Sequence, residues 1–81
     1  MVSREEETLR KIVSKILLLN ESTFGDDLSR NDLEAWDSLA HLMLISEVES
    51  SFQVTLSDDD IVAINTVGDL RRMLRKLGVG V

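Results

Sequence analysis

Ser38 is the residue whose setting in this sequence most favours chemistry, because it follows Asp37 at the predicted start of a helix, after a long polar segment. The first turn of a helix offers unpaired amides and the positive end of the helix dipole, and both favour an attached or bound phosphate. The Ser38 hydroxyl is expected to be exposed there for modification, whereas Leu39 is expected to turn inward and fix the helix register. An Asp-Ser pair also begins many ordinary helices, so capping is the simpler explanation of these residues by themselves.

His41 lies three residues after Ser38 on the same helical face, which raises the question of a Ser–His nucleophile pair. Such a pair needs a group that orients the base and a site for an oxyanion, and His41 is the only histidine of the chain. A small hydrolase built on Ser38 and His41 is therefore disfavoured. His41 is instead expected at the surface or in contact with a partner.

The acidic run from Asp58 to Asp60 is a candidate for metal binding. A calcium-binding loop between two helices needs a glycine at its sixth position and a glutamate at its twelfth. Counted from Asp58, these positions hold Ala63 and Asp69, so no metal site is predicted. These three acids are better explained by a position at the N-terminus of a short helix, where the positive end of the helix dipole stabilises them.

The first apolar residues of the chain recur at helical spacing and predict a helix over about residues 3–19. Ser3 and Glu6 form a capping-box pattern before them. Asn20 is placed to end this helix.

Residues 20–36 form a long polar connection, which is unusual in a compact domain. Its few apolar residues are expected to pin it onto the core, with a short helical turn near residues 31–34. The only tryptophan, Trp36, is expected to cover the core beside this loop. Long pinned loops often flank a functional site.

A second helix is predicted over about residues 37–51, with Asp37 as its N-cap. Residues 53–56 are expected to be extended, because two of the four are β-branched. The apolar stripe predicted to face the core from this helix consists of Leu39, Leu42, Ile45, Val48 and Phe52.

A short third helix is predicted over about residues 57–63, capped by Ser57, and a fourth over about 66–77, capped by Thr66 with Asp69. The pattern therefore predicts an all-α fold, a four-helix bundle of three long helices and one short helix.

The chain length of 81 residues predicts a single domain spanning residues 1–81. A domain of this size buries only roughly 60% of its unfolded surface and has little room for an enclosed catalytic cleft, so an enzyme is disfavoured. The chain has no cysteine, which excludes a disulfide framework and thiolate metal sites.

The apolar runs of the sequence fall short of the roughly 18 residues that a membrane span needs. The first residues, Met1 to Glu7, carry three acids, which is unlike a signal peptide. A cytoplasmic location is expected.

Charge is distributed very unevenly along the chain, whose net charge is −6. Residues 20–70 hold twelve acids and one base, Arg30, whereas residues 1–19 have a net charge of +1 and residues 71–81 one of +4. The acidic middle repels a phosphate backbone, which disfavours nucleic-acid binding. It is expected to attract basic patches on partner proteins and to speed encounter with them.

The wider pattern links Ser38 to the segments that follow it. Asp37-Ser38-Leu39 precedes an apolar stripe with Glu47, Glu49, Phe52 and Val54, then the acidic run 58–60, Ile61 and Thr66-Val67-Gly68-Asp69-Leu70. Together these residues resemble the acyl carrier protein family along nearly the whole chain, as far as Leu77.

That resemblance implies a four-helix bundle that catalyses nothing itself and bears 4′-phosphopantetheine on Ser38. Acyl groups are then carried as thioesters on the thiol of this arm. A phosphopantetheinyl transferase is the implied first partner, with Ser38 Oγ accepting the group from coenzyme A while the transferase supplies base and metal. Asp37 is the expected acidic contact beside Ser38. The other expected partners are acyl-loading and acyl-transfer enzymes with basic patches. The chain itself is expected to be a monomer.

The chain departs from the fatty-acid members of that family. Trp36 stands where they usually have a small residue, and it can also shape the entrance through which an acyl chain enters the bundle. Ala40 and Met43 stand where acids usually occur on the second helix, and Ser50 and Ser51 replace further acids. A role as a dedicated carrier in a specialised acyl, polyketide or aminoacyl pathway is thus as well supported as a role in fatty-acid biosynthesis.

An unmodified acidic helical module for protein interaction, in which Ser38 only caps, is the alternative function. The residues expected to meet partner proteins are Asp37, Leu39, Met43, Glu47, Asp58, Asp59 and Asp60.

Overall fold

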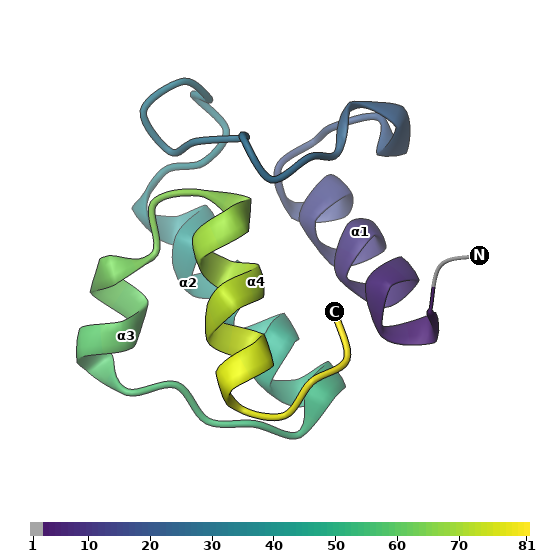
Figure 1. Cartoon of the computed structure of the whole chain (residues 1–81). Helices are drawn as coiled ribbons and strands as arrows, with labels where there is room; N and C mark the ends of the chain where they lie inside the picture. The colour runs from purple at the N-terminus through teal and green to yellow at the C-terminus, as the bar shows by residue number, and fades with distance from the viewer. Residues whose placement is uncertain (1–2) are drawn as a thin grey trace.

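The computed structural model describes residues 3–81, and over this range it contains helices and no β-strand, as the sequence predicted. In Figure 1, α4 runs in front of α2, with α1 on one side of this pair and the short α3 on the other. The elements are α1 (Arg4–Ile16), the short 3₁₀ helix η1 (Glu21–Thr23), α2 (Ser38–Phe52), α3 (Asp58–Ala63) and α4 (Val67–Lys76). The fold is therefore the expected all-α bundle of three long helices and one short one.

The hydrophobic core is built from α1, α2 and α4 and from residues of the connections, whereas α3 has no fully buried residue. Full burial of a leucine or valine side chain contributes about 1.5–3 kcal/mol, so these residues supply most of the driving force for folding. The buried hydrophobic residues are Leu9, Ile12, Val13, Leu17, Trp36, Ala40, Leu44, Ile45, Val48, Leu56, Ile64, Val67, Leu70 and Leu74.

The buried face of α2 differs from the predicted apolar stripe. Ile45 and Val48 are buried as predicted, but Leu39 and Leu42 are 68% and 60% exposed. Residues 39–45 are almost all apolar, so hydrophobic periodicity in this stretch cannot select one face. The residues that join Ile45 and Val48 on the buried face are Ala40, His41 and Leu44.

The end of α1 comes earlier than predicted, at Ile16. Leu18 has a left-handed backbone with φ of 57° and is 83% exposed. Glycine or asparagine usually takes this conformation, so a leucine there gives no stop signal in the sequence. Asn20 does not end α1; its side chain accepts a 3.2 Å hydrogen bond from the Ser22 amide and caps η1.

The connection from α2 to α3 is also tighter than predicted. Gln53 is not extended, because its φ of 57° is left-handed and ends α2 after Phe52. Glu49 Oε2 accepts a 2.8 Å hydrogen bond from the Leu56 amide and holds the connection in place. α3 then begins after Ser57, whose hydroxyl caps its first turn as the sequence predicted.

The long loop between α1 and α2 is held against the start of α4. The amides of Val67 and Gly68 donate 3.0 Å hydrogen bonds to the carbonyls of Leu28 and Asp26. A Cβ on Gly68 would lie 3.3 Å from the Asp26 carbonyl oxygen, so glycine permits this close approach. The apolar loop residues that pack against the core are Phe24, Leu28 and Leu33, and Trp36 lies within it.

The predicted helical turn near residues 31–34 is wrong. Two hydrogen-bonded turns occupy this part of the loop, one from the Asp32 amide to the Ser29 carbonyl and one from the Trp36 amide to the Leu33 carbonyl, each 3.1 Å long. They bring Trp36 into the core immediately before α2 begins.

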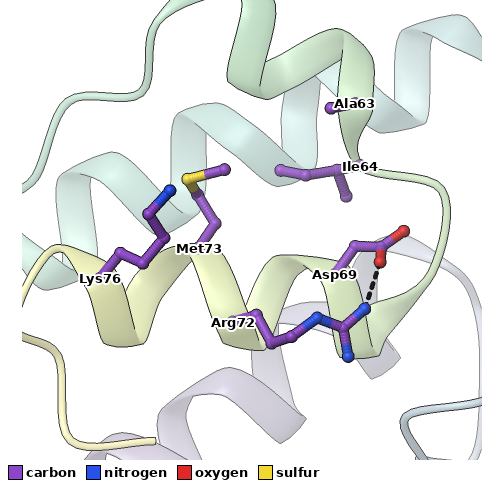
Figure 2. Close-up of a pocket in the computed structure, with 6 residues that line it drawn as sticks. All are labelled: Ala63, Ile64, Asp69, Arg72, Met73 and Lys76. Carbon is purple, nitrogen blue, oxygen red and sulfur yellow. Dashed lines mark hydrogen bonds and ion pairs between the residues drawn. The ribbon is translucent and has the colours of Figure 1, made fainter.

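A groove of about 280 Å³ separates α4 from the end of α3. In Figure 2 the side chains of Met73 and Ile64 point towards each other across it, and an ion pair between Arg72 and Asp69 lies at one end. Asp69 also completes the predicted cap of α4, since its Oδ2 accepts a 3.1 Å hydrogen bond from the Thr66 amide. The groove residues are Ala63, Ile64, Asp69, Arg72, Met73 and Lys76.

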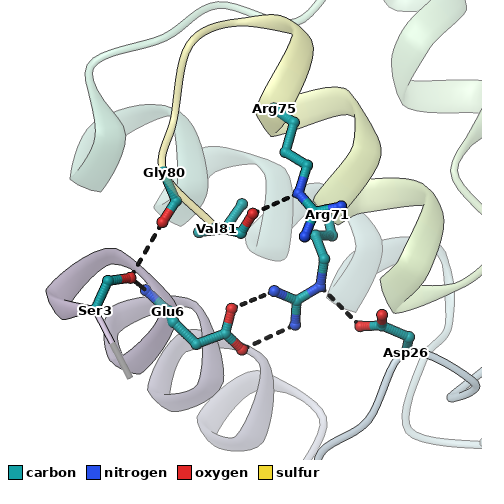
Figure 3. A network of polar contacts seen from close by, with 7 residues as sticks. All are labelled: Ser3, Glu6, Asp26, Arg71, Arg75, Gly80 and Val81. Atoms are coloured by element: carbon teal, nitrogen blue, oxygen red, sulfur yellow. Dashed lines mark hydrogen bonds and ion pairs between the residues drawn. The ribbon is translucent and has the colours of Figure 1, made fainter. Parts of the chain in front are cut away.

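Arg71 on α4 joins α1 to the long loop through charged hydrogen bonds (Figure 3). Its guanidinium donates to both carboxylate oxygens of Glu6, and its Nε donates to Asp26 Oδ1 at 2.9 Å. The Arg71 and Glu6 side chains are only 12% and 17% exposed. The hydrogen bonds from Arg71 hold the pKa of the Glu6 carboxyl below its ordinary value of 4.5.

This ion pair explains why only half of the predicted capping box of α1 forms. Ser3 Oγ accepts a 3.1 Å hydrogen bond from the Glu6 amide as predicted. The Glu6 carboxylate, however, turns to Arg71. Ser3 Oγ also donates to the Gly80 carbonyl at 3.1 Å, which places the last residues beside the start of α1 (Figure 3).

Glu6→Gln is expected to lower the free energy of unfolding at neutral pH by about 1–3 kcal/mol, because it weakens a largely buried charged hydrogen bond. The folded-state pKa of Glu6 is depressed, so its contribution is present above pH 4.5 and is lost as the pH falls through the lower folded value. The difference between the natural chain and the variant should therefore shrink in acid. Urea unfolding followed by circular dichroism at several pH values measures it.

Glu7→Gln is the matched control, because the exposed Glu7–Lys11 pair has an N–O distance of 3.4 Å and should contribute less than about 0.5 kcal/mol. Equal losses for the two variants, or a Glu6→Gln loss that is independent of pH, would contradict this account of the Arg71 network.

Candidate functional site

Ser38 is the first residue of α2, directly after the N-cap Asp37. Asp37 Oδ1 accepts a 2.8 Å hydrogen bond from the Ala40 amide, and the Asp37 carbonyl accepts one from the His41 amide at 2.9 Å. Asp37, Ser38 and Leu39 are all exposed. The cap therefore fixes the helix start and leaves the Ser38 hydroxyl accessible to another molecule.

Leu39 does not turn inward, contrary to the sequence prediction. It is 68% exposed, and two further apolar residues of α2, Leu42 and Met43, are 60% and 49% exposed. α3 contributes Val62, which is 74% exposed. Apolar side chains are thus presented to solvent by both helices, and partner binding is a common reason for such exposure.

His41 is not a surface residue, and this expectation was wrong. Its side chain is 4% exposed, Nδ1 lies 3.0 Å from Trp36 Nε1, and Nε2 lies 2.8 Å from the Ile61 carbonyl oxygen. Both ring nitrogens are therefore occupied by hydrogen bonds inside the bundle. A general base needs a free ring nitrogen within reach of its substrate, so His41 does not activate Ser38.

Trp36 fills the core before α2, with 2% of its surface exposed. Its ring stacks on that of His41 with centroids 6.1 Å apart. The prediction that Trp36 covers the core is confirmed. Sequence reasoning missed its pairing with His41, although the two residues are only five positions apart.

The acidic residues predicted to meet partners lie on two helices. Glu47 on α2 is half-buried, and its Oε1 accepts a 3.3 Å hydrogen bond from Lys15 Nζ. Asp58 and Asp59 are exposed in the first turn of α3, where Asp60 is half-buried. Acids at this position are stabilised by the positive end of the helix dipole.

Met43 and Glu47 lie together with Ser46 and Ser50 around a shallow hollow of about 320 Å³ on α2. The hollow therefore includes two of the predicted partner-contact residues. Among the described residues 3–81, no group of three or more acidic or histidine side chains is arranged to hold a metal ion. In the same range, no helix is both long and apolar enough to cross a membrane.

Comparisons with known proteins agree on one family. The family model described as "Phosphopantetheine attachment site" matches residues 7–74. An acyl carrier protein of Buchnera aphidicola subsp. Schizaphis graminum is 40% identical over 68 residues, which cover 76% of this chain and 78% of that protein. The chain belongs to the acyl carrier protein family.

Other members of the acyl carrier protein family match over most of their length. An acyl carrier protein of Thermotoga maritima is 35% identical over 78 residues, covering 94% of this chain and 96% of that protein. The solution NMR structure of a holo acyl carrier protein from Geobacter metallireducens has a TM-score of 0.71 and 26% identity, covering 94% of this chain and 93% of that one. Resemblance in sequence and in fold therefore extends over nearly the whole chain.

Membership of the acyl carrier protein family makes this chain a carrier with a phosphopantetheine prosthetic group rather than an enzyme. In general, the family acts with transferases and acyl-handling enzymes. The start of α2 suits such a group, because it combines an accessible hydroxyl on Ser38 with the first amides of a helix. A phosphodiester attached there would lie at the positive end of the helix dipole.

Asp37→Ala is expected to lower the free energy of unfolding by about 1 kcal/mol, because the Ala40 amide loses its acceptor at the start of α2. Asp37→Asn should cost far less, since an asparagine oxygen accepts the same hydrogen bond without the charge. Urea unfolding of both variants measures this. Equal losses would show that the charge of Asp37, and not its capping hydrogen bond, stabilises α2.

Proposed function

We propose that Ser38 is the attachment site of phosphopantetheine, and that this chain carries acyl groups between partner enzymes. The observation that supports it best is the exposed hydroxyl on the first residue of α2, directly after a cap that fixes the helix start. When attached, the arm supplies a thiol on which acyl groups are carried as thioesters. The bundle itself supplies the hydroxyl and a binding surface.

In the attachment step, Ser38 Oγ forms a new bond to the phosphorus of coenzyme A that bears the pantetheine part. The bond from that phosphorus to the remaining nucleotide phosphate breaks, and the nucleotide leaves. The proton of the Ser38 hydroxyl goes to a base of the transferase, because the only histidine of this chain is buried with both ring nitrogens occupied. Asp37 contributes the cap and a negative charge beside the reacting hydroxyl.

The surface proposed to meet partner enzymes combines apolar and acidic residues of α2 and α3. Its apolar members are exposed and suit close packing against a partner, which commonly supplies most of an interface's binding energy. Its acids favour partners with basic patches, chiefly through the rate of encounter. The proposed members are Asp37, Leu39, Met43, Glu47, Asp58, Asp59 and Asp60, and we add Leu42 and Val62 because both are exposed.

We further propose that this carrier serves a specialised acyl, polyketide or aminoacyl pathway rather than general fatty-acid synthesis. Ala40 no longer supports this proposal, because it is 7% exposed and belongs to the core, where it cannot contact a partner. Met43, Ser50 and Ser51 remain exposed on α2 where acids are usual in the fatty-acid members. These three uncharged residues cannot form ion pairs with basic fatty-acid enzymes, so α2 offers such enzymes fewer acids.

Ser38→Ala is expected to fold like the natural chain, because Asp37 still caps α2, and to gain no mass when incubated with a broad-specificity phosphopantetheinyl transferase and coenzyme A. The natural chain should gain the mass of one phosphopantetheinyl group. Intact-protein mass spectrometry measures both. Asp37→Asn keeps the capping hydrogen bond and removes only the negative charge, so this variant should still be modified, but more slowly.

Modification of the Ser38→Ala variant at another residue would overturn the assignment of Ser38. An unmodified natural chain would favour the alternative of an acidic interaction module in which Ser38 has no covalent role. Ser57→Ala is the control for the loss of a serine that caps a helix: it removes the hydroxyl that caps α3 and leaves Ser38 in place, so this variant should still gain the mass of the arm.

Met43→Glu is expected to raise the turnover of the holo form by generic fatty-acid elongation enzymes several-fold, because it restores a negative charge on the exposed face of α2. Met43→Gln is the matched uncharged control and should have little effect. Initial rates with the three holo proteins measure this. Turnover of the natural protein equal to that of an ordinary fatty-acid carrier would overturn the specialised-pathway proposal.

A further inference from the structure

Of the four α-helices, α3 is the one whose own residues are least buried. Its six residues include none that is fully buried; Ile61 is half-buried and Val62 is 74% exposed. Its start is held indirectly, through the hydrogen bond from the Leu56 amide to Glu49. The buried side chains of Leu56 and Ile64 therefore anchor α3 from its two ends, whereas its own residues contribute little burial and form part of the proposed partner surface.

A chain of two hydrogen bonds adds a direct link from α3 itself to α2. An indole N–H can only donate, so Trp36 Nε1 donates to His41 Nδ1 over 3.0 Å. The neutral imidazole then carries its proton on Nε2, which donates to the Ile61 carbonyl over 2.8 Å. Ile61 lies in the last turn of α3, and its carbonyl also accepts a 3.4 Å hydrogen bond from the amide of Ile64, the C-cap residue.

The same chain links α3 to the start of α2. His41 lies one turn after Ser38 on α2, and its ring is 4% exposed. Because both ring nitrogens are used, the ring has a single orientation that satisfies its two partners. The location of Val62, next to Ile61, is thereby set relative to Ser38.

We propose that His41 is a positioning residue that holds α3 against the first turn of α2 and so sets how tightly partner enzymes bind beside Ser38. This inference rests on the proposed function of Ser38 as the attachment site. His41 acts through the Ile61 carbonyl and contacts neither the arm nor a partner.

Two substitutions separate the two hydrogen bonds of His41. His41→Asn places an oxygen near the former Nδ1 and can accept from Trp36, but it is too short to reach the Ile61 carbonyl. His41→Gln places an amide N–H near the former Nε2 and keeps the bond to Ile61. Trp36→Phe removes the indole N–H and leaves the bond from His41 to Ile61 intact.

Amide hydrogen exchange of the purified unmodified chains tests the structural part. In His41→Asn, exchange of the α3 amides of Val62 and Ala63 should accelerate about threefold to tenfold, the effect of losing one hydrogen bond, relative to the α2 amide of Leu44. In His41→Gln and Trp36→Phe these α3 amides should keep their relative protection. Acceleration spread equally over α2 and α3 in His41→Asn would show that His41 is only a general core residue.

Transfer kinetics test the functional part, with a broad-specificity phosphopantetheinyl transferase and coenzyme A. His41→Asn should raise KM for the carrier about threefold to tenfold while kcat stays unchanged, and His41→Gln should restore KM. An unchanged KM in His41→Asn would overturn the inference. If the natural chain accepts no arm at all, the proposed function of Ser38 fails, whereas the exchange result still decides whether His41 positions α3.

Discussion

The hydrogen bond from the Ala40 amide to the Asp37 carboxylate is the contact on which the arrangement of α2 depends, because it sets where that helix begins. Once the first residue is Ser38, helical geometry decides which side chains face the core. Ala40 and His41 lie inside, whereas Ser38 and Leu39 lie outside. The Asp37 cap therefore leaves Ser38 accessible to other proteins and places His41 in the core.

The other helices are held around α2 by two polar networks of different character. Arg71 ties α4 to α1 and to the long loop through Glu6 and Asp26; all three groups are charged, and Arg71 and Glu6 are largely buried whereas Asp26 is exposed. His41 ties the loop to α3 through neutral groups; the Trp36 and His41 side chains are almost fully buried, and Ile61 is half-buried. A domain of this size has a small core, so such directional contacts specify the packing that hydrophobic burial leaves open.

A carrier has to be recognised by several enzymes in turn, and the surface of this chain suits that task. Exposed leucine, methionine and valine side chains lie on α2 and α3, within residues 20–70, which hold twelve acids and one base. Long-range attraction then speeds encounter, and apolar contacts provide affinity once the partner is docked. The bundle itself needs no catalytic group, which agrees with the burial of its only histidine.

The sequence by itself determined the four α-helices, the caps at Asp37, Ser57 and Thr66, and the resemblance that pointed to Ser38, because these depend on local patterns. Tertiary structure alone decided the inward face of α2, since a stretch that is apolar on every side has no periodicity to read. It also decided the early end of α1 at an unexpected left-handed Leu18. The diversion of Glu6 from its capping box to Arg71 and the burial of His41 between Trp36 and Ile61 could not be predicted either. Each depends on a partner that only folding brings close, and a side chain takes the hydrogen bond that its folded surroundings offer.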